Sequence, residues 1–297
     1  MLNIKGRPCV AKGASAGFGE AIAKEALARG DSIIASSRRG ATLKHLEAAG
    51  ALVLDLDVTS DDATLQAAMQ KGIDKYGKIT HFINAPGFLL SGPAEGASAK
   101  DAFDSFNVNV LAIMNLTRLQ IAYLRPKGKE AGGVIANFGS VGSWRGVPAA
   151  AHYASAKWAV SGFTESIHDE VKEFGINVTV IEPGYFRTSF LNPGGNNVRP
   201  VSNLLEAEYA GSGVEKLRNM LTAVDNNQPG DVVKGAKVIV DVLTGTGVAA
   251  GKEFPVRLLL GQDCINVVRA KMAQTEKLIE EWYDVSAHTD HDDVKKN

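Results

Sequence analysis

The chain has 297 residues, and its 32 lysines and arginines nearly balance its 33 aspartates and glutamates, so we expect a small-molecule ligand and no nucleic-acid partner. Only two cysteines occur, Cys9 and Cys264, which gives neither a disulfide framework nor the ligand spacing of a metal site. No apolar run reaches membrane-spanning length and the first residues lack the apolar segment of a signal peptide, which predicts a cytoplasmic protein without a membrane span.

Short apolar runs alternate with segments of helical periodicity in the first half of the chain. Strands are predicted at residues 8–11, 32–37, 53–58 and 79–84, and helices at 20–29, 61–76 and 99–124. The last of these helices carries Asn107 and Asn109 within an apolar segment. Because asparagine is a modest helix former, two of them there indicate a polar role inside the protein.

The second half continues the alternation after a break rich in glycine and proline. Strands are predicted at 134–138, 176–182 and 256–260, and helices at 153–175, 232–242 and from 262 to about 282. Residues 190–228 are rich in Asn, Gly, Pro and Ser, which favours an irregular insertion with one or two short helices, acting as a lid over a substrate. The polar residues 286–297 are expected to form a disordered tail.

This order of elements predicts the fold class. The seven predicted strands are continuous apolar runs separated by helices, which is typical of a parallel sheet covered on both faces. The sequence therefore predicts a single α/β domain over residues 1–285, with a doubly wound, seven-stranded parallel sheet. Ligands of such sheets bind at the carboxyl ends of the strands.

Three glycines, Gly13, Gly17 and Gly19, lie between the first predicted strand and the first predicted helix. Glycine there lets the backbone turn tightly, approach a pyrophosphate without a clash and pack the helix against the sheet, with the helix N-terminus facing the anion. Such a turn can also be purely structural. Its position between a strand and a helix favours dinucleotide binding.

The second predicted strand ends at Ser36 and Ser37 and is followed by Arg38 and Arg39. A carboxylate at this place would bind the ribose 2′-hydroxyl of NAD(H), whereas arginines suit the 2′-phosphate of NADP(H). NADP(H) is therefore the predicted cofactor, and NAD(H) the less favoured one. The alternative is that both arginines belong to a solvated turn.

A serine, a tyrosine and a lysine follow the fifth predicted strand: Ser140, Tyr153 and Lys157. In a helix, Tyr153 and Lys157 lie on the same face one turn apart, where the ammonium favours ionisation of the phenol. Ser140 adds a hydroxyl that can reach the same point. The three suit reduction of a carbonyl or oxidation of an alcohol, although a surface tyrosine packed on a lysine stem would show the same spacing.

Together these motifs resemble the short-chain dehydrogenase/reductase family over nearly the whole chain, and within it the 17β-hydroxysteroid-dehydrogenase-like branch. The resemblance implies a Rossmann-type domain that uses NAD(P)H. It rests on residues in the family's order and spacing: Gly13, Gly17, Gly19, Asp57, Val58, Asn84, Asn109, Ser140, Tyr153, Lys157, Pro183, Gly184 and Thr188.

The resemblance also implies catalytic roles. Tyr153 would protonate the substrate oxygen in reduction or accept its proton in oxidation, and Ser140 would hold that oxygen. Lys157 would lower the pKa of Tyr153 and bind the nicotinamide ribose, and Asn109 would hold a water that links Lys157 to solvent. The expected cofactor-binding residues are Gly13, Ser15, Gly17, Phe18, Gly19, Ser37, Arg38, Arg39, Asp57, Val58, Asn84, Ala85, Tyr153, Lys157, Pro183, Gly184, Phe186 and Thr188.

Three positions depart from the family pattern. Lys12 stands where the family has a threonine that ties the glycine turn to its neighbour, and Ala85-Pro86 stands where Asn-Ala is usual. Ala16 stands where many NADP-using members carry a basic residue, so Arg38 and Arg39 would bind the phosphate without it.

The function predicted is an oxidoreductase that interconverts a ketone and a secondary alcohol on a fairly apolar substrate of steroid, polyketide or terpenoid type. Two alternatives stay open: an NADP(H)-binding sensor or scaffold without turnover, and a non-redox isomerase or cyclase that uses the same tyrosine. Trp158 and Phe163 extend the apolar stripe of the Tyr153 helix. Family members pair this helix and the Asn109 helix between subunits, so a homodimer or homotetramer is expected, although burial against the chain's own sheet would explain the stripe as well.

Overall fold

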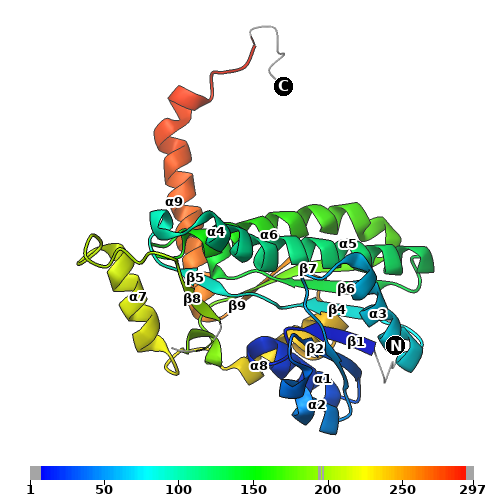
Figure 1. Cartoon of the computed structure of the whole chain (residues 1–297). Helices are drawn as coiled ribbons and strands as arrows, with labels where there is room; N and C mark the ends of the chain where they lie inside the picture. Colours follow the sequence, from blue (N-terminus) through cyan, green and yellow to red (C-terminus); the bar gives the residue numbers. More distant parts are fainter. Residues whose placement is uncertain (1–7, 193–194, 196, 292–297) are drawn as a thin grey trace.

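A seven-stranded parallel sheet forms the centre of the computed structural model, which describes residues 8–192, 195 and 197–291 (Figure 1). Its strand order is β3-β2-β1-β4-β6-β7-β9. The strands are β1 (Pro8–Lys12), β2 (Ser32–Ser37), β3 (Leu52–Asp55), β4 (His81–Asn84), β6 (Gly133–Phe138), β7 (Ile176–Pro183) and β9 (Arg257–Leu260). All pairings in this sheet are parallel, which confirms the predicted doubly wound sheet.

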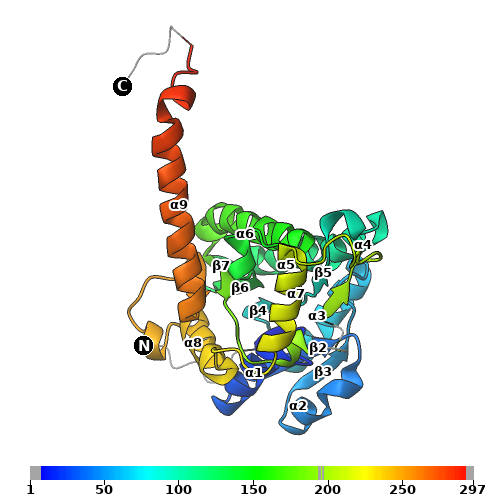
Figure 2. The ribbon, with the colours of Figure 1, turned by 90° about the vertical axis from the view of Figure 1, so that its left-hand side faces the viewer.

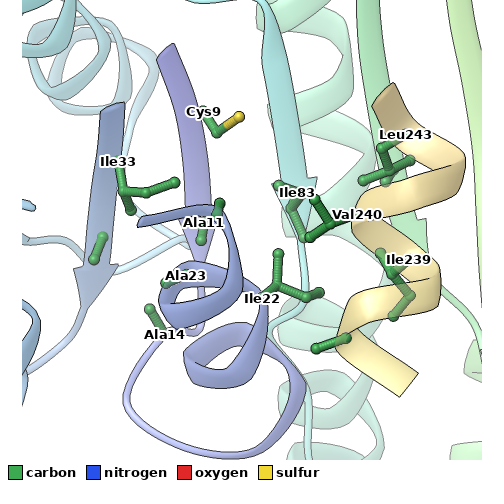
Figure 3. Packing of buried hydrophobic residues seen from close by; sticks show 14 of the residues in the cluster. Cys9, Ala11, Ala14, Ile22, Ala23, Ile33, Ile83, Ile239, Val240 and Leu243 are labelled. Atoms are coloured by element: carbon green, nitrogen blue, oxygen red, sulfur yellow. The ribbon is translucent and has the colours of Figure 1, made fainter. Parts of the chain in front are cut away.

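One face of the sheet is covered by α1 (Gly17–Ala28), α2 (Lys44–Ala48) and α8 (Val232–Thr244). Figure 3 shows how the apolar stripe of α8 and the small residues of α1 meet over β1 and β4. Ala23 is fully buried, so the α1 backbone lies close to the sheet. The helix that begins at the glycine turn is thereby fixed against the strands.

The opposite face is covered by α3 (Asp62–Tyr76), α4 (Ala99–Phe106), α5 (Ala112–Leu124) and α6 (Ala151–Val171). Buried apolar side chains of α3, α5 and α6 pack on Phe82 and Ile135 of the sheet. Asp61 caps α3 by accepting a hydrogen bond from the Thr64 amide, and Ser98 forms a capping box with Asp101 at the start of α4.

The segment predicted as one helix over 99–124 contains a change of helix type. Residues Asn107–Leu111 form a π-helical turn that joins α4 to α5. Such a turn inserts one extra residue and is common at functional sites. Here it places Asn109, which is completely buried, toward the carboxyl end of β4.

The insertion over 190–228 is more ordered than its composition suggests. Its strand β8 (Val198–Pro200) pairs in parallel with β5 (Leu89–Ser91), and α7 (Gly213–Val224) follows. Three-residue strands carry no detectable alternation, so this second sheet was not expected from the sequence. Leu89 of β5 packs with Leu191 and with Leu221 of α7.

Several short 3₁₀ turns connect these elements. They are Gly40–Leu43, Ala94–Gly96, Arg125–Lys127, Val141–Ser143, Lys172–Phe174, Ser189–Leu191 and Gly247–Ala249. The turn after β6, Val141–Ser143, matters most for the site because Ser140 is its N-cap.

The last helix, α9 (Gln262–Ser286), projects from the body of the domain (Figures 1 and 2). It extends to Ser286, beyond the predicted end near residue 282; of the tail predicted over 286–297, residues 292–297 lie outside the described part. Within the described ranges, no helix has the length and apolar character needed to cross a membrane.

Candidate active site

A cleft of about 500 Å³ opens at the carboxyl ends of the strands, at the point where the strand order reverses between β1 and β4. The structure brings most of the predicted site residues to its walls. They are Gly13, Ser15, Gly17, Phe18, Gly19, Ser37, Arg38, Asp57, Val58, Ala85, Ser140, Tyr153, Lys157, Pro183, Gly184, Phe186 and Thr188. Three predicted residues, Arg39, Asn84 and Asn109, do not line the cleft.

The glycine turn forms one end of the cleft. Gly13 and Gly17 have φ of 79° and 61°, and a Cβ on Gly19 would lie 2.4 Å from the carbonyl oxygen of Gly13. The N-cap of α1, Ala16, supplies no side-chain hydrogen bond, so the first amides of the helix are left for a ligand in the cleft. Backbone shape and helix N-terminus together fit a dinucleotide pyrophosphate.

The turn is tied to β2 without the threonine that Lys12 replaces. The amides of Gly13 and Ala14 donate to the carbonyl oxygen of Ser36, at 3.1 and 3.2 Å. The backbone therefore holds the turn by itself. The side chain of Lys12 lies outside the described part of the chain.

Two arginines face the end of the cleft next to β2. Arg38 and Arg199 of β8 both line the cleft; Arg38 is exposed and Arg199 is partly buried. The guanidinium of Arg199 stacks 3.7 Å from the centre of the Phe88 ring. Burial, and next the charge of Arg38, lower the pKa of Arg199, while Asp104 acts in the opposite direction.

Arg39 does not take part in this pair. It is exposed outside the cleft, and its backbone amide donates to Ser37 Oγ at 3.1 Å. The second cation near Arg38 is therefore Arg199. The sequence did not reveal this, because Arg199 lies about 160 residues further along the chain and reaches the cleft only through the pairing of β8 with β5. Asp57 also lines the cleft, and its Oδ1 accepts hydrogen bonds from the amide and the hydroxyl of Thr59.

Helix α6 positions the tyrosine and lysine as the spacing predicted. The Lys157 ammonium lies 5.7 Å from the centre of the Tyr153 ring and donates to the carbonyl oxygen of Phe138 at 2.8 Å. Ser140 Oγ accepts from the Gly142 amide at 3.0 Å and is hydrogen-bonded to the Tyr153 side chain. The Ser140 hydroxyl, the Tyr153 phenol and the Lys157 ammonium thus lie close together where β6 and α6 border the cleft.

Burial dominates the protonation of this group. It raises the pKa of Tyr153 to about 12, against a hydrogen bond with Ser140 that acts to lower it. Burial likewise lowers the pKa of Lys157 to about 8. Burial therefore outweighs the other influences on both groups, with the Lys157 ammonium directed to Phe138, and the expected lowering of the Tyr153 pKa by Lys157 stays a prediction.

Asn109 supports the wall of the cleft from behind. Its Oδ1 accepts from the Phe88 amide and its Nδ2 donates to the Phe88 carbonyl, each at 3.0 Å. A Cβ on Gly87 would lie 2.7 Å from Asn109 Oδ1 and 3.5 Å from Lys157 Nζ. Asn109 and Lys157 therefore approach the same backbone closely, and the water that Asn109 is expected to hold stays a prediction.

Asn84 is placed differently from the expectation. It is completely buried and exchanges two hydrogen bonds with Gln120, at 2.8 and 3.0 Å, and donates to Asn137 at 2.9 Å. Asn137 in turn donates to Thr164. This network links β4 and β6 to α5 and α6, so the Asn84 amide joins the sheet to its helices and does not face the cleft.

The lid supplies an apolar wall. Leu191, Leu217 and Leu221 line the cleft, together with Phe190, whose ring centre lies 6.4 Å from that of Tyr153. Gln228 completes this side. Across the described residues, no three His, Cys, Asp or Glu side chains gather as a metal site.

Comparison with known proteins agrees with this geometry. A profile of the family described as short chain dehydrogenase matches residues 9–197. The oxidoreductase BOA17 of Botryotinia fuckeliana is 31% identical over 278 residues, which cover 92% of this chain and 96% of that protein. The 3-oxoacyl-[acyl-carrier-protein] reductase FabG of Escherichia coli is 30% identical over 190 residues, 63% of this chain and 76% of FabG.

Solved structures agree as well. A short-chain dehydrogenase from Streptomyces avermitilis has a TM-score of 0.84 at 29% identity, covering 97% of this chain and 100% of that one. One from Burkholderia phymatum, solved in complex with NAD, shares the fold with a TM-score of 0.74 at 20% identity over 100% of both chains. With its glycine turn, Ser140, Tyr153 and Lys157 all inside the matched region, this chain belongs to the short-chain dehydrogenase/reductase family of oxidoreductase enzymes.

Proposed function

We propose that the protein is an NADP(H)-dependent oxidoreductase that interconverts a ketone and a secondary alcohol on a fairly apolar substrate of steroid, polyketide or terpenoid type. The observation that carries the proposal is a single cleft that holds both the glycine turn at the start of α1 and the group Ser140, Tyr153 and Lys157. A dinucleotide on the turn and a carbonyl beside Tyr153 would therefore lie in contact.

A bound nicotinamide cofactor supplies the hydride. Tyr153 is protonated at neutral pH, and burial raises its pKa still further; it would give that proton to the substrate oxygen in reduction. Ser140 donates a hydrogen bond to the same oxygen. Lys157 would bind the cofactor ribose, and Pro183, Gly184 and Thr188, which line the same cleft, would hold the nicotinamide end.

The preference for NADP(H) is supported by charge. β2 ends in serines followed by Arg38, and Arg199 lies near enough for the two charges to interact. Two guanidiniums suit a phosphate monoester, with paired hydrogen bonds that a ribose hydroxyl cannot offer. We therefore assign the 2′-phosphate of NADP(H) to the space between Arg38 and Arg199.

The apolar substrate is supported by the lid. Leu191, Leu217 and Leu221 face the same cleft as the Tyr153 ring, and the packing of α7 on Leu89 keeps that wall in place. Burying one such side chain against a ligand contributes roughly 1.5–3 kcal/mol. A substrate with a large apolar body gains most from this wall.

A homodimer or homotetramer belongs to the proposal. Phe103 is 60% exposed, Leu111 48% and Trp158 45%, although all three are large apolar residues. They lie on α4, the π-helical turn and α6, which pack together. Phe163, also expected at the interface, is only partly exposed.

The test is turnover with a panel of apolar ketones and NADPH, compared with the Tyr153→Phe variant. We expect steady NADPH oxidation by the wild-type protein and a loss of about 10²–10⁴-fold in kcat/KM in the variant, because the proton donor is removed. Tyr283→Phe, on the exposed part of α9, serves as the control. NADPH binding without turnover would support the sensor or scaffold, and substrate conversion without nicotinamide oxidation would support an isomerase or cyclase.

A further inference from the structure

Gln228 is a buried amide that the mechanism above does not use. It is 1% exposed and lines the cleft. Among the described residues, neither its Nε2 nor its Oε1 has a hydrogen-bond partner. A buried amide with both groups unpaired is unfavourable, and native structures rarely leave one so without a reason.

The backbone holds this side chain in a fixed place. The Gly230 amide donates to the Tyr185 carbonyl at 3.0 Å, and the Arg187 amide donates to the Gly230 carbonyl at 2.8 Å. The Arg187 guanidinium also donates to the Gln228 carbonyl, at 3.3 Å. Gln228 is thereby fastened to the segment that follows β7.

That segment is the proposed nicotinamide end of the cleft. Phe186 and Thr188 line the cleft next to Pro183 and Gly184, and Phe186 forms a β-bridge with Gly230. Gln228 therefore faces the cleft beside the residues that would hold the nicotinamide ring.

The two unpaired groups favour a ligand that offers a hydrogen-bond donor and an acceptor together. A pyrophosphate or a ketone oxygen only accepts hydrogen bonds, and would leave Oε1 unpaired. An ammonium or guanidinium only donates, and would leave Nε2 unpaired. A primary carboxamide offers an acceptor and a donor in one plane, which matches both groups of a glutamine amide at once.

We propose that Gln228 binds the carboxamide of the nicotinamide ring, with Nε2 donating to the carboxamide oxygen and Oε1 accepting from its NH₂ group. This rests on the proposed function, which places the nicotinamide at this end of the cleft. Gln228 then fixes the rotation of the carboxamide and helps to hold one face of the ring toward Tyr153.

The test compares NADPH with its 3-acetylpyridine analogue, in which a methyl replaces the NH₂ group, in wild-type protein and in Gln228→Met. Dissociation constants are measured by calorimetry. The wild-type protein should bind NADPH about tenfold more tightly than the analogue, since one hydrogen bond is lost. In Gln228→Met, NADPH binding should weaken and this ratio should approach one.

The ratio is measured within each variant, so it does not depend on a loss of folded protein. Asn227→Met, at the exposed neighbouring position, should keep the wild-type ratio. Tight NADPH binding with an unchanged ratio in Gln228→Met would overturn this inference alone. An unchanged ratio with a raised KM for the ketone would overturn it in favour of substrate binding. Wild-type protein that binds neither nucleotide would overturn the proposed function as well.

Discussion

The Lys157 ammonium is almost completely buried and donates to the Phe138 carbonyl. Burial lowers its pKa to about 8, so between about pH 8 and 10.5, the ordinary pKa of lysine, the unfolded chain binds a proton that the folded protein has released. Stability therefore rises with pH across this window. Tyr153 acts in the opposite direction above pH 10, because its pKa is raised to about 12 and its folded form keeps a proton that the unfolded chain loses.

Replacing Lys157 by Met should reveal this linkage. At pH 7 the wild-type protein holds a buried charge that the variant lacks, and near pH 10.5 it does not. The free energy of unfolding of wild type relative to Lys157→Met should therefore rise by about 3 kcal/mol between these pH values. Urea unfolding at several pH values measures it. Parallel curves for the two proteins would contradict the burial of a titrating ammonium.

The arginine pair gives a second test at single residues. Arg38→Asp should weaken NADPH binding by about 10²-fold and Arg199→Ala by about tenfold, since each removes a charge-assisted contact with the 2′-phosphate. NADH binding should change little in Arg199→Ala. Arg39→Ala is the matched control, because that exposed side chain lies outside the cleft. Equal losses for NADPH and NADH would argue against a phosphate site. Fluorescence titration measures all four proteins.

At the scale of elements, the structure of the segment over 190–228 depends on helix α7 and on the pairing of β5 with β8. Composition suggested an irregular lid with one or two short helices, and α7 is such a helix; its apolar side packs on Leu89 and Leu191. The same side faces the cleft through Leu217 and Leu221. Helix α7 thus completes the hydrophobic cluster of the lid and also forms the apolar wall of the site.

Leu217→Gln and Leu221→Gln should raise KM for an apolar ketone by about tenfold each, because a polar amide replaces apolar contact with the ligand. NADPH affinity should stay within about twofold if the wall contacts substrate only. Lys216→Gln, one residue away and exposed, should leave both values unchanged. A parallel loss of NADPH affinity in the leucine variants would show that α7 supports the cofactor instead.

At the scale of the whole molecule, exposed apolar side chains gather on α4, the π-helical turn and α6. Large exposed apolar patches on a folded domain mark interaction surfaces. Phe103, Leu111 and Trp158 are exposed on the face that we propose pairs between subunits. The exposed part of α9 carries further large apolar residues, including Leu278 and Trp282.

Trp158→Glu should convert the oligomer to a smaller species, because a charge would be buried at the centre of the interface. Light scattering after size-exclusion chromatography measures the mass. Phe174→Glu, in the 3₁₀ turn that follows α6 and 41% exposed, is the control that should keep the wild-type mass. A monomeric wild-type protein, or an unchanged mass in Trp158→Glu, would place the interface elsewhere.

The sequence by itself determined the seven strands, the glycine turn and the neighbourhood of Tyr153 and Lys157. These features are local: an apolar run, a set of glycines before a helix, and a four-residue helical spacing each act within a few residues. The π-helical turn and the β5–β8 pair were not visible, because neither has a periodicity long enough to detect.

Only the tertiary structure decided which side chains share the cleft. Arg199, in place of Arg39, stands near Arg38 because a strand of the lid pairs with β5, and Asn84 turns to Gln120 because helix α5 lies behind β4. The protonation of Tyr153 and Lys157 was likewise set by burial, and the position of Gln228 by hydrogen bonds to the segment after β7. Each of these depends on groups distant in the chain, whose meeting is a property of packing and not of spacing.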